Sequence, residues 1–289
     1  MIYKIENKML CAQISDCGAE LISVKRYGLV EVMWQGREPF WSSHAPVLFP
    51  VCGSLLNQKY TYGGKEYDMP FHGFARRKTF TLVEHSDEQL ILKLVADEQT
   101  RRIYPFDFEL LAEFSLYGDE IFFTYKVTNK GEDVMPYMLG WHPGFNLPGE
   151  CNIGDFKLLL EKSEDVQWYP LQHGGFVRPY GEKYEMQNNC YYLNEEEIYK
   201  NDTMIYTGVG RWATLSCPEN QRILRLRWRD EDTYLCIWKN ADKKARFICI
   251  EPWSDVPADG ETPENFETRK MSRLSSGESK SYQFGIKIS

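Results

Sequence analysis

Long apolar runs are missing from this sequence, and their absence excludes a membrane-spanning helix. No stretch of about 18 consecutive apolar residues occurs. The start, MIYKIENKMLCAQI, has no basic segment followed by an apolar core and a small-residue cleavage site. We therefore expect a cytoplasmic protein that makes no membrane contact.

Closely spaced cysteines are also missing. The eight cysteines are dispersed and form no C-x-x-C pair: Cys11, Cys17, Cys52, Cys151, Cys190, Cys217, Cys236 and Cys249. This spacing supports neither a zinc knuckle nor a small disulfide scaffold. Most of these cysteines lie in apolar runs, where a free thiol behaves as a small hydrophobic group.

Positive charge is in deficit, with a formal net charge of -8 and a pI near 5.3. Binding to a phosphate backbone needs a basic stripe, so we expect no nucleic-acid partner. The densest basic segment, RILRLRWR at 222–229, alternates arginine with leucine or tryptophan. A period of two predicts one solvated face of a strand.

Helical periodicity is weak throughout, whereas strand signals recur. The segments 59–69 and 108–129 each predict a hairpin, with turns at Gly63-Gly64 and Gly118-Asp119. The best helical candidates are PENFETRK at 263–270 and NEEEIYKN at 194–201. Without internal repeats or linkers, the pattern favours an all-β fold, one large antiparallel β-sandwich forming a single domain over residues 1–289.

Glu251 stands out because it ends an apolar run, ARFICIEPW, that predicts a strand buried on both faces. An unpaired carboxylate costs several kcal/mol to bury, or its pKa rises. Glu251 therefore needs a partner or a catalytic task. The alternative is a glutamate at a strand end that turns into solvent or pairs with an arginine.

Two of the five histidines also lie beside turn signals. His72 precedes a glycine in FHGFARR, and His142 precedes Pro143-Gly144 in GWHPGFN. Loop residues on a rigid sheet are where sites are commonly built. Each is equally consistent with a structural loop histidine. We interpret the remaining histidines as surface or structural residues: His44, His85 and His173.

Two histidines and a glutamate also match a common set of metal ligands. The sequence has neither an H-x-H pair nor an H-E-x-x-H helix to supply a rigid bidentate platform. We therefore favour a site without a metal, although spacing alone does not exclude one.

Four segments, in this order, resemble the aldose 1-epimerase (galactose mutarotase-like) superfamily, and most closely its LacX-like branch. They are FWSSHAPVLFPVCGSL, YTYGGKEYDMPFHGFAR, GWHPGFNLPG and CIEPW. The resemblance implies a large β-sandwich that binds a sugar without a metal or organic cofactor. It implies that Glu251 removes the anomeric proton, that His142 protonates the ring oxygen, and that His72 is a second hydrogen-bond partner.

The chemistry of anomer exchange agrees with these roles. Opening a sugar ring at C1 and closing it on the other face requires one proton removed and one supplied. A carboxylate and an imidazole, with ordinary pKa values of about 4.3 and 6.5, suit base and acid near neutral pH. No electrons move and no group leaves, so the reaction needs no cofactor.

A sugar site also requires hydroxyl ligands and an aromatic wall. Arg76 is the best candidate ligand, followed by Asp202, for which a turn aspartate is the alternative. Trp253 is a candidate wall residue, with a core tryptophan as the alternative. Asn57 is a weaker candidate. Galactose mutarotases commonly have an arginine soon after the glycine of the segment seen here as VCGSL, where this chain has Ser54. That difference counts against a simple transfer of galactose specificity.

A hexose-6-phosphate 1-epimerase is the nearest alternative function. A phosphate favours two or more converging cations. Arg76 and Arg77 are adjacent, and on an extended backbone they would point in opposite directions. A phosphate site would then need a cation from elsewhere, such as Arg37 or Lys59.

Two further alternatives use similar ligands. A glycoside hydrolase ordinarily needs two carboxylates that flank the bond, and only Glu251 is placed convincingly. A non-catalytic sugar-binding protein would use the same pocket, but it would have no use for an acid and a base.

Overall fold

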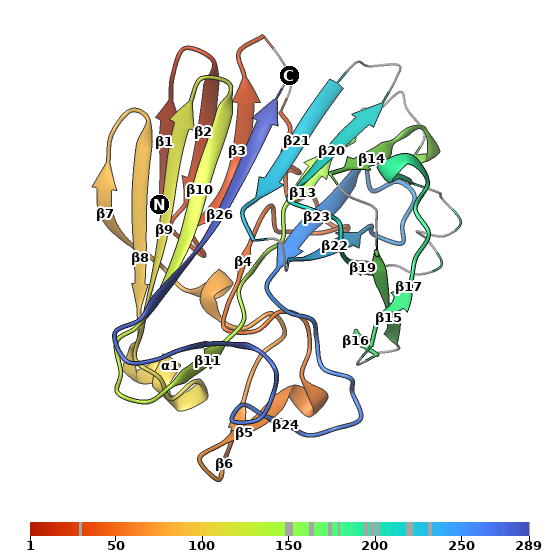
Figure 1. Cartoon of the computed structure of the whole chain (residues 1–289). Coiled ribbons are helices and arrows are strands. Elements are labelled where there is room, and N and C mark those ends of the chain that lie inside the picture. Colours follow the sequence, from red (N-terminus) through yellow and green to blue (C-terminus); the bar gives the residue numbers. More distant parts are fainter. Residues whose placement is uncertain are drawn as a thin grey trace.

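Antiparallel strands dominate the computed structural model (Figure 1). It describes residues 1–28, 31–147, 153–161, 165–172, 175–178, 180–193, 196, 200, 203–217, 222–230 and 233–288. The α-helix with described bounds is α1 (Glu98–Ile103). Its first turn is closed by a capping box, in which the Asp97 side chain accepts a hydrogen bond from the Thr100 N–H at 2.6 Å.

The first large sheet crosses the whole molecule in Figure 1. Its nine strands, in spatial order, are β18 (Cys190–Tyr192), β14 (Lys157–Leu160), β20 (Trp212–Cys217), β21 (Arg222–Trp228), β26 (Ser279–Ile288), β10 (Glu120–Asn129), β9 (Phe108–Tyr117), β8 (Gln89–Val95) and β7 (Thr81–His85). The predicted hairpin at 108–129 is confirmed, because β9 and β10 pair from Phe108↔Asn129 to Tyr117↔Glu120. Side chains alternate between buried and partly exposed along β9, as expected for a sheet that covers a core on one face.

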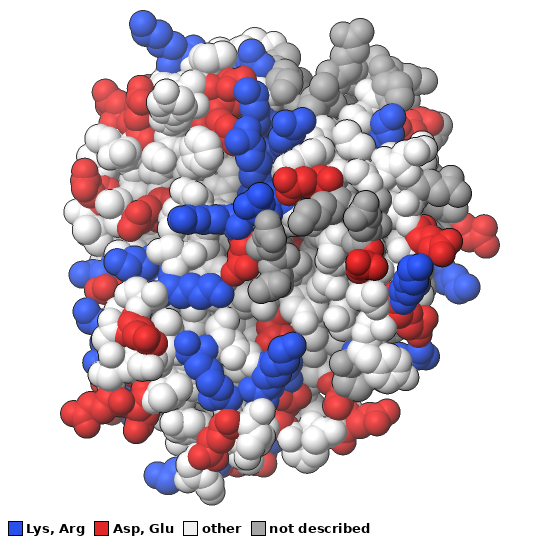
Figure 2. All heavy atoms as spheres, viewed as in Figure 1, with Lys and Arg blue, Asp and Glu red and all other residues white. Residues whose placement is uncertain are grey.

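The arginine-rich segment lies on β21, in the middle of this sheet. Leu224 and Leu226 are buried, whereas Arg225 and Arg227 are partly exposed. The predicted solvated face is therefore confirmed. On the face of the molecule seen in Figure 2, lysine and arginine side chains lie among aspartate and glutamate side chains.

The second large sheet carries the strand that ends near Glu251. Along its main path the strands are β16 (Phe176–Val177), β15 (Gln167–Gln172), β19 (Thr203–Thr207), β22 (Tyr234–Trp238), β23 (Phe247–Trp253), β12 (Gly140–Trp141) and β4 (Val47–Leu48). Two more strands join beside that path, β13 (Gly144–Asn146) on β23 and β17 (Glu182–Lys183) on β15.

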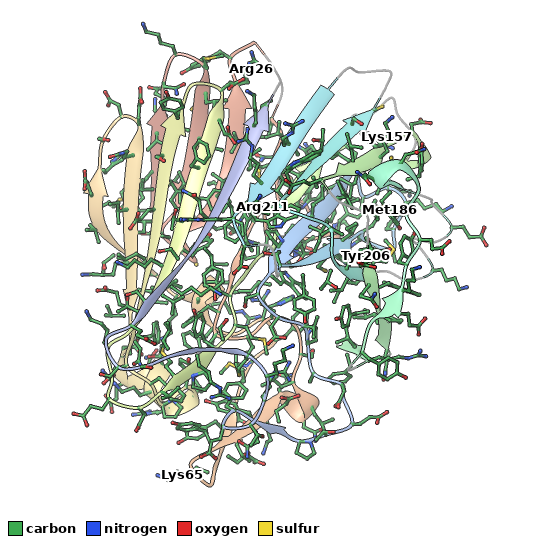
Figure 3. The ribbon with its side chains drawn as sticks, viewed as in Figure 1. Arg26, Lys65, Lys157, Met186, Tyr206 and Arg211 are labelled. Atoms are coloured by element: carbon green, nitrogen blue, oxygen red, sulfur yellow. The ribbon has the colours of Figure 1, made fainter. Side chains whose placement is uncertain are left out.

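Three smaller sheets complete the strand structure of the described residues. They comprise β1 (Ile2–Glu6), β2 (Leu10–Ser15) and β3 (Glu20–Arg26); β11 (Met135–Tyr137) and β25 (Ser272–Leu274); and β24 (Glu264–Asn265), β5 (Lys59–Tyr62) and β6 (Lys65–Asp68). The predicted hairpin at 59–69 is confirmed by β5 and β6, which pair from Lys59↔Asp68 to Tyr62↔Lys65. Figure 3 shows Lys65 at the tip of this hairpin, at the end of the molecule opposite the C-terminus.

Four short 3₁₀ turns lie between strands in the described part of the chain: η1 (Leu56–Gln58), η2 (Ala75–Arg77), η3 (Ile153–Asp155) and η4 (Gln187–Asn189). The expected helix at 263–270 is wrong. The segment instead begins with β24, which pairs in parallel with β5, and continues as a turn in which Asn265 accepts hydrogen bonds from Glu267 and Arg269. An isolated eight-residue helix is marginal, so the pairing with β5 determines the structure. Most of the second helical candidate, 194–201, lies outside the described residues.

The two large sheets pack against each other, and Trp141 shows how. This residue of the second sheet is buried, and its ring lies 4.3 Å from that of Phe123 and 5.8 Å from that of Phe284, both in the first sheet. Ile250 of β23 belongs to the same core. The predicted antiparallel β-sandwich is therefore confirmed. Because strand side chains alternate, residues next to Trp141 and Ile250 face away from the first sheet.

None of the helices among the described residues has the length and apolar character needed to cross a membrane.

Candidate active site

Glu251 lies near the end of β23, a fully buried strand of the second sheet. Every residue of β23 is buried, and Glu251 is 0% exposed. The next strand, β22, pairs with it so that Cys236 lies opposite Glu251. Since side chains alternate along a strand, Glu251 shares its face with Cys249 and Trp253, opposite to the core residue Ile250. The alternative of a glutamate turned into solvent is excluded by this burial.

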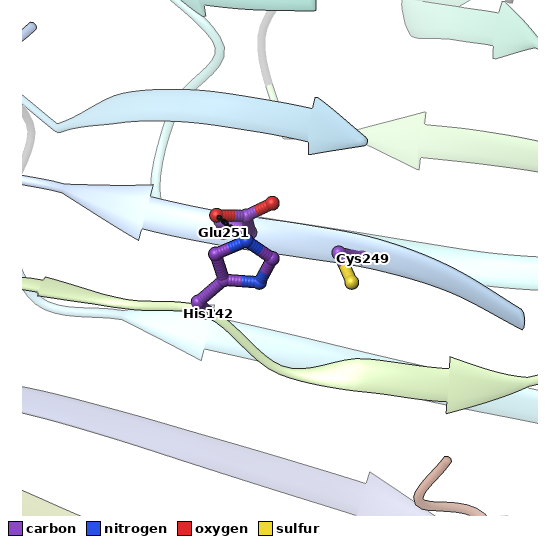
Figure 4. Close-up of side chains that lie close together, drawn as sticks. All are labelled: His142, Cys249 and Glu251. Atoms are coloured by element: carbon purple, nitrogen blue, oxygen red, sulfur yellow. Dashed lines mark ion pairs between the residues drawn. The ribbon is translucent and has the colours of Figure 1, made fainter. Parts of the chain in front are cut away.

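His142 is brought to the same face by the turn between β12 and β13. Both strands pair with β23, through Gly140↔Trp253 and Gly144↔Cys249, so the turn crosses beside Glu251. The His142 backbone N–H donates to the Pro46 carbonyl at 3.1 Å, which anchors the turn to the segment before β4. In the resulting geometry Nε2 of His142 lies 3.3 Å from Oε2 of Glu251 (Figure 4).

His72 reaches this group from a strained loop position. Its φ is 62°, in the left-handed region, and the next residue, Gly73, has a φ of 69°. A Cβ on Gly73 would lie 2.1 Å from the Phe49 carbonyl oxygen, so only glycine fits there. The rings of His72 and His142 are perpendicular, with centroids 5.5 Å apart. The structure thus brings His72, His142 and Glu251 together from three distant parts of the chain.

Backbone hydrogen bonds fix the tautomer of His72. The His72 N–H donates to the Gly53 carbonyl at 2.9 Å, and the Gly53 N–H donates to Nδ1 of His72 at 2.9 Å. Because Nδ1 accepts a hydrogen bond, the neutral ring carries its proton on Nε2. His72 therefore offers an N–H donor.

Burial shifts the titration of both histidines. It lowers the pKa of His142 to about 3 and lowers the pKa of His72 well below its usual range. The His142 and Arg76 charges add to the effect on His72. Both rings are therefore neutral near neutral pH.

Aromatic rings surround His142. The ring of Trp41 lies 4.9 Å from it and that of Trp238 lies 5.6 Å from it. Trp41 also stacks on Phe247 with centroids 5.6 Å apart. A Cβ on Gly144 would lie 2.7 Å from the Trp41 ring, which explains the glycine in the HPGFN segment.

Both the sequence and the fold resemble those of known proteins. The aldose 1-epimerase family model matches residues 1–270. The chain is 28% identical over 276 residues to chromosomal Protein LacX of Lactococcus lactis subsp. lactis, covering 89% of this chain and 88% of that protein. The solved structure of a galactose mutarotase related enzyme from Lactobacillus acidophilus superposes with a TM-score of 0.93 at 32% identity, over 100% of this chain and 97% of that one.

The chain belongs to the aldose 1-epimerase family. Its similarity to LacX places it in the LacX-like branch. An Escherichia coli (strain K12) protein provisionally named glucose-6-phosphate 1-epimerase is 32% identical over 120 residues, covering 38% of each chain.

The other residues predicted to contact a sugar differ in their burial and in their distance from the two histidines. Arg76 is partly buried, its guanidinium carbon lies 5.9 Å from the centroid of the Phe71 ring, and its charge acts on both histidines. Trp253 is 4% exposed, and its ring lies 5.7 Å from that of His72. Asn57 is exposed in η1, with a φ of 55°. Asp202 lies outside the described residues.

One premise about the arginines is wrong. Arg76 and Arg77 lie in η2, a 3₁₀ turn, and not on an extended backbone. Arg76 is partly buried and Arg77 is exposed, so the two side chains still have different surroundings. Lys59 forms an ion pair with Glu66 on the neighbouring strand, and Arg37 is exposed.

The histidines interpreted as structural behave accordingly where they are described. The Nε2 of His85 lies 2.9 Å from the Lys4 carbonyl oxygen, and His44 lies 3.9 Å from the Glu20 carboxylate. His173 lies outside the described residues.

A cavity of about 1170 Å³ lies at the end of β23, where Trp253 is part of its lining. Pro252, Ser254 and Asp255 line it together with residues of β26, including Tyr282 and Phe284. Neither catalytic candidate histidine nor Glu251 belongs to its lining. The titratable groups of the candidate site therefore lie outside the lining of this cavity.

Proposed function

We propose that this chain is an aldose 1-epimerase, a mutarotase that interconverts the α and β anomers of a hexose. The observation that carries the proposal is the 3.3 Å approach of Nε2 of His142 to Oε2 of Glu251. Both groups are buried, and the His72 ring lies beside them. Membership of a family of carbohydrate epimerases supports the same reaction class.

The two groups supply the proton transfers that ring opening needs. Glu251 takes the proton from the anomeric hydroxyl while the C1–O5 bond breaks, and protonated His142 gives a proton to O5. Rotation about C1–C2 then presents the other face of the aldehyde. Closure runs the transfers in reverse, so Glu251 and His142 return to their starting states.

Burial keeps His142 neutral near neutral pH, so the proposed reaction requires this pair to take up one proton when the sugar binds. Burial favours the neutral imidazole of His142, whereas a carboxylate 3.3 Å away favours the imidazolium. A sugar that hydrogen-bonds to both groups places its anomeric hydroxyl beside Glu251 and its ring oxygen beside the imidazolium. The reaction moves only protons, so it requires no cofactor.

Neighbouring residues orient the sugar. The Nε2–H of His72, set by the bond from Gly53, donates a hydrogen bond near the ring oxygen. Arg76 binds a hydroxyl group. The rings of Trp41 and Trp238 form the apolar wall, since sugars stack their C–H faces on aromatic rings.

A hexose 6-phosphate is the second candidate substrate, supported by the partial similarity to the E. coli protein named for glucose 6-phosphate. The charge arrangement favours an unphosphorylated sugar. Four cations were candidates for a phosphate site. The charge of Arg76 lowers the pKa of both histidines, whereas Lys59 forms an ion pair with Glu66. Arg37 and Arg77 are exposed.

Polarimetry tests the proposal. Freshly dissolved α-D-glucose and α-D-galactose are followed with and without protein, and glucose 6-phosphate is followed by an NMR exchange readout. Faster equilibration of a free hexose is expected. Acceleration of the phosphate ester alone would assign the second function. No acceleration of any of the three would contradict the proposal for these sugars and favour a non-catalytic sugar-binding protein.

A further inference from the structure

Cys249 lies beside the two residues that carry the proposed proton transfers. It precedes Glu251 by two positions on β23, so both side chains point to the face that His142 covers (Figure 4). One ligand atom from each of His142, Cys249 and Glu251 lies within 4.8 Å of the others. Cys249 is a free cysteine with 0% exposure.

These three donors suit a particular class of metal ion. Imidazole nitrogen, thiolate sulfur and carboxylate oxygen are zinc ligands, at about 2.0 to 2.3 Å from the ion. Around a tetrahedral ion such ligand atoms lie roughly 3.3 to 3.8 Å apart, so small side-chain rotations from the present positions close the set. A thiolate disfavours the hard ions Mg²⁺ and Ca²⁺.

A second observation comes from His142 itself. Its Nδ1 is buried and has no hydrogen-bond partner within the described part of the chain. The ring is therefore held by packing against Trp41 and Trp238 and by its 3.3 Å approach to Glu251. No hydrogen bond at Nδ1 restrains it from turning slightly toward a metal ion.

We propose that His142, Cys249 and Glu251 form an inhibitory binding site for a thiophilic divalent cation such as Zn²⁺. The ion bonds to Nε2 of His142, the sulfur of Cys249 and a carboxylate oxygen of Glu251, and a water molecule completes the tetrahedron. The thiol proton of Cys249 is released to solvent on binding. The bound ion occupies the lone pairs that the epimerase reaction needs, so metal and sugar exclude each other. The inhibitory effect rests on the proposed function, whereas the binding site does not.

Cobalt(II) provides a direct test, because a cysteine thiolate bound to Co²⁺ gives a near-ultraviolet charge-transfer band. The purified full chain is titrated with Co²⁺, and Zn²⁺ is then added to displace it. The same titrations are run on Cys249→Ala and on Cys217→Ala, a buried free cysteine on β20 of the other large sheet. Cys249→Ser serves as a closer isostere if the alanine variant folds poorly.

We expect the band in wild type and in Cys217→Ala, and its loss in the Cys249 variants. Zn²⁺ affinity should fall by more than about 100-fold in those variants, since even the loss of an outer hydrogen-bond partner costs 10- to 100-fold. Micromolar Zn²⁺ should inhibit wild-type epimerase, and a chelator should reverse the inhibition. Inhibition should disappear in Cys249→Ala, measured against that variant's own rate.

The outcomes separate this inference from the proposed function. Absence of the band in wild type, or an unchanged band in folded Cys249→Ser, overturns the metal site whatever the enzyme activity. A band that depends on Cys249, in a protein that accelerates none of the sugars, retains the metal site and overturns only the function. Metal binding with an unaffected epimerase rate overturns the inhibitory role.

Discussion

Replacing Glu251 by glutamine is the sharpest perturbation of the proposed mechanism. Glutamine has nearly the same size and shape as glutamate, but its amide cannot accept the anomeric proton. Positioned acids and bases contribute about 10²- to 10⁴-fold to rate. We therefore expect Glu251→Gln to lower kcat/KM for the best hexose by that range, which corresponds to roughly 2.7 to 5.4 kcal/mol of transition-state stabilisation.

The structure predicts that this loss occurs without unfolding. Glu251 is fully buried, and its carboxylate lies 3.3 Å from Nε2 of His142. The glutamine amide N–H₂ can donate to that nitrogen when the ring is neutral, so the contact with His142 can be kept. Removing one partner of a buried ion pair is costly mainly because the other charge is left uncompensated. Burial lowers the pKa of His142 to about 3, so its ring is neutral and no such charge remains. The melting temperature should therefore stay close to that of wild type.

The assay is polarimetry with the spontaneous rate of anomer exchange subtracted. The matched control is Glu120→Gln, a buried glutamate of β10 whose carboxylate oxygen lies 3.3 Å from the Arg227 guanidinium, in the other large sheet. The control should keep the wild-type rate. Full activity in Glu251→Gln would refute the assignment of the base. Equal losses in both variants would show that the effect is not specific to the site.

Five further outcomes are expected for the site and the loop that carries His72. His142→Gln should lower kcat/KM about as much as Glu251→Gln, because it removes the acid, and a rate near wild type would mean that the acid lies elsewhere. His72→Asn, which suits the left-handed backbone, should cost less activity. Burial holds the pKa of His72 below that of the unfolded chain, so below about pH 6.5 the unfolded state binds more protons. The stability of wild type should therefore fall on acidification, and the stability of His72→Asn should fall less steeply. Melting temperatures that change with pH in parallel for the two proteins would contradict this. Gly73→Ala should destabilise by more than about 3 kcal/mol in urea titrations, whereas Gly63→Ala, whose added Cβ meets no atom within 4 Å, should cost about 1 to 2 kcal/mol. Incubation with a chelator should leave epimerase activity unchanged, and a loss that zinc restores would indicate a catalytic metal.

Local patterns were sufficient to predict the hairpins and the two-sided burial of β23. Both depend on neighbouring residues, namely the glycine turns and an unbroken apolar run. The segment 263–270 shows where this reasoning fails. Its proline and charged residues are compatible with a helix, but the segment pairs with β5, which is distant in the sequence. A pairing between remote strands leaves no local signal.

The candidate site was only partly predictable for the same reason. His72, His142 and Glu251 were identifiable one at a time, from turn signals and a buried carboxylate. Their mutual approach depends on the register of β12 and β13 against β23. Trp238 was missed because only the pairing Trp238↔Cys249 brings it beside His142. Cys249 did leave a signal, since its two-residue spacing from Glu251 on a strand places both on one face.

The site lies on strands whose other faces form the core, and this arrangement holds the acid–base pair rigidly. Trp141 packs between the sheets and His142 is the next residue; Ile250 packs in the same core and Glu251 is the next residue. Each catalytic candidate is therefore held by a core neighbour on the opposite face. A substitution of Trp141 in the core would therefore move His142 relative to Glu251. Part of the packing energy of the sandwich thus maintains the 3.3 Å separation between Nε2 of His142 and Oε2 of Glu251, on which the proposed proton transfer depends.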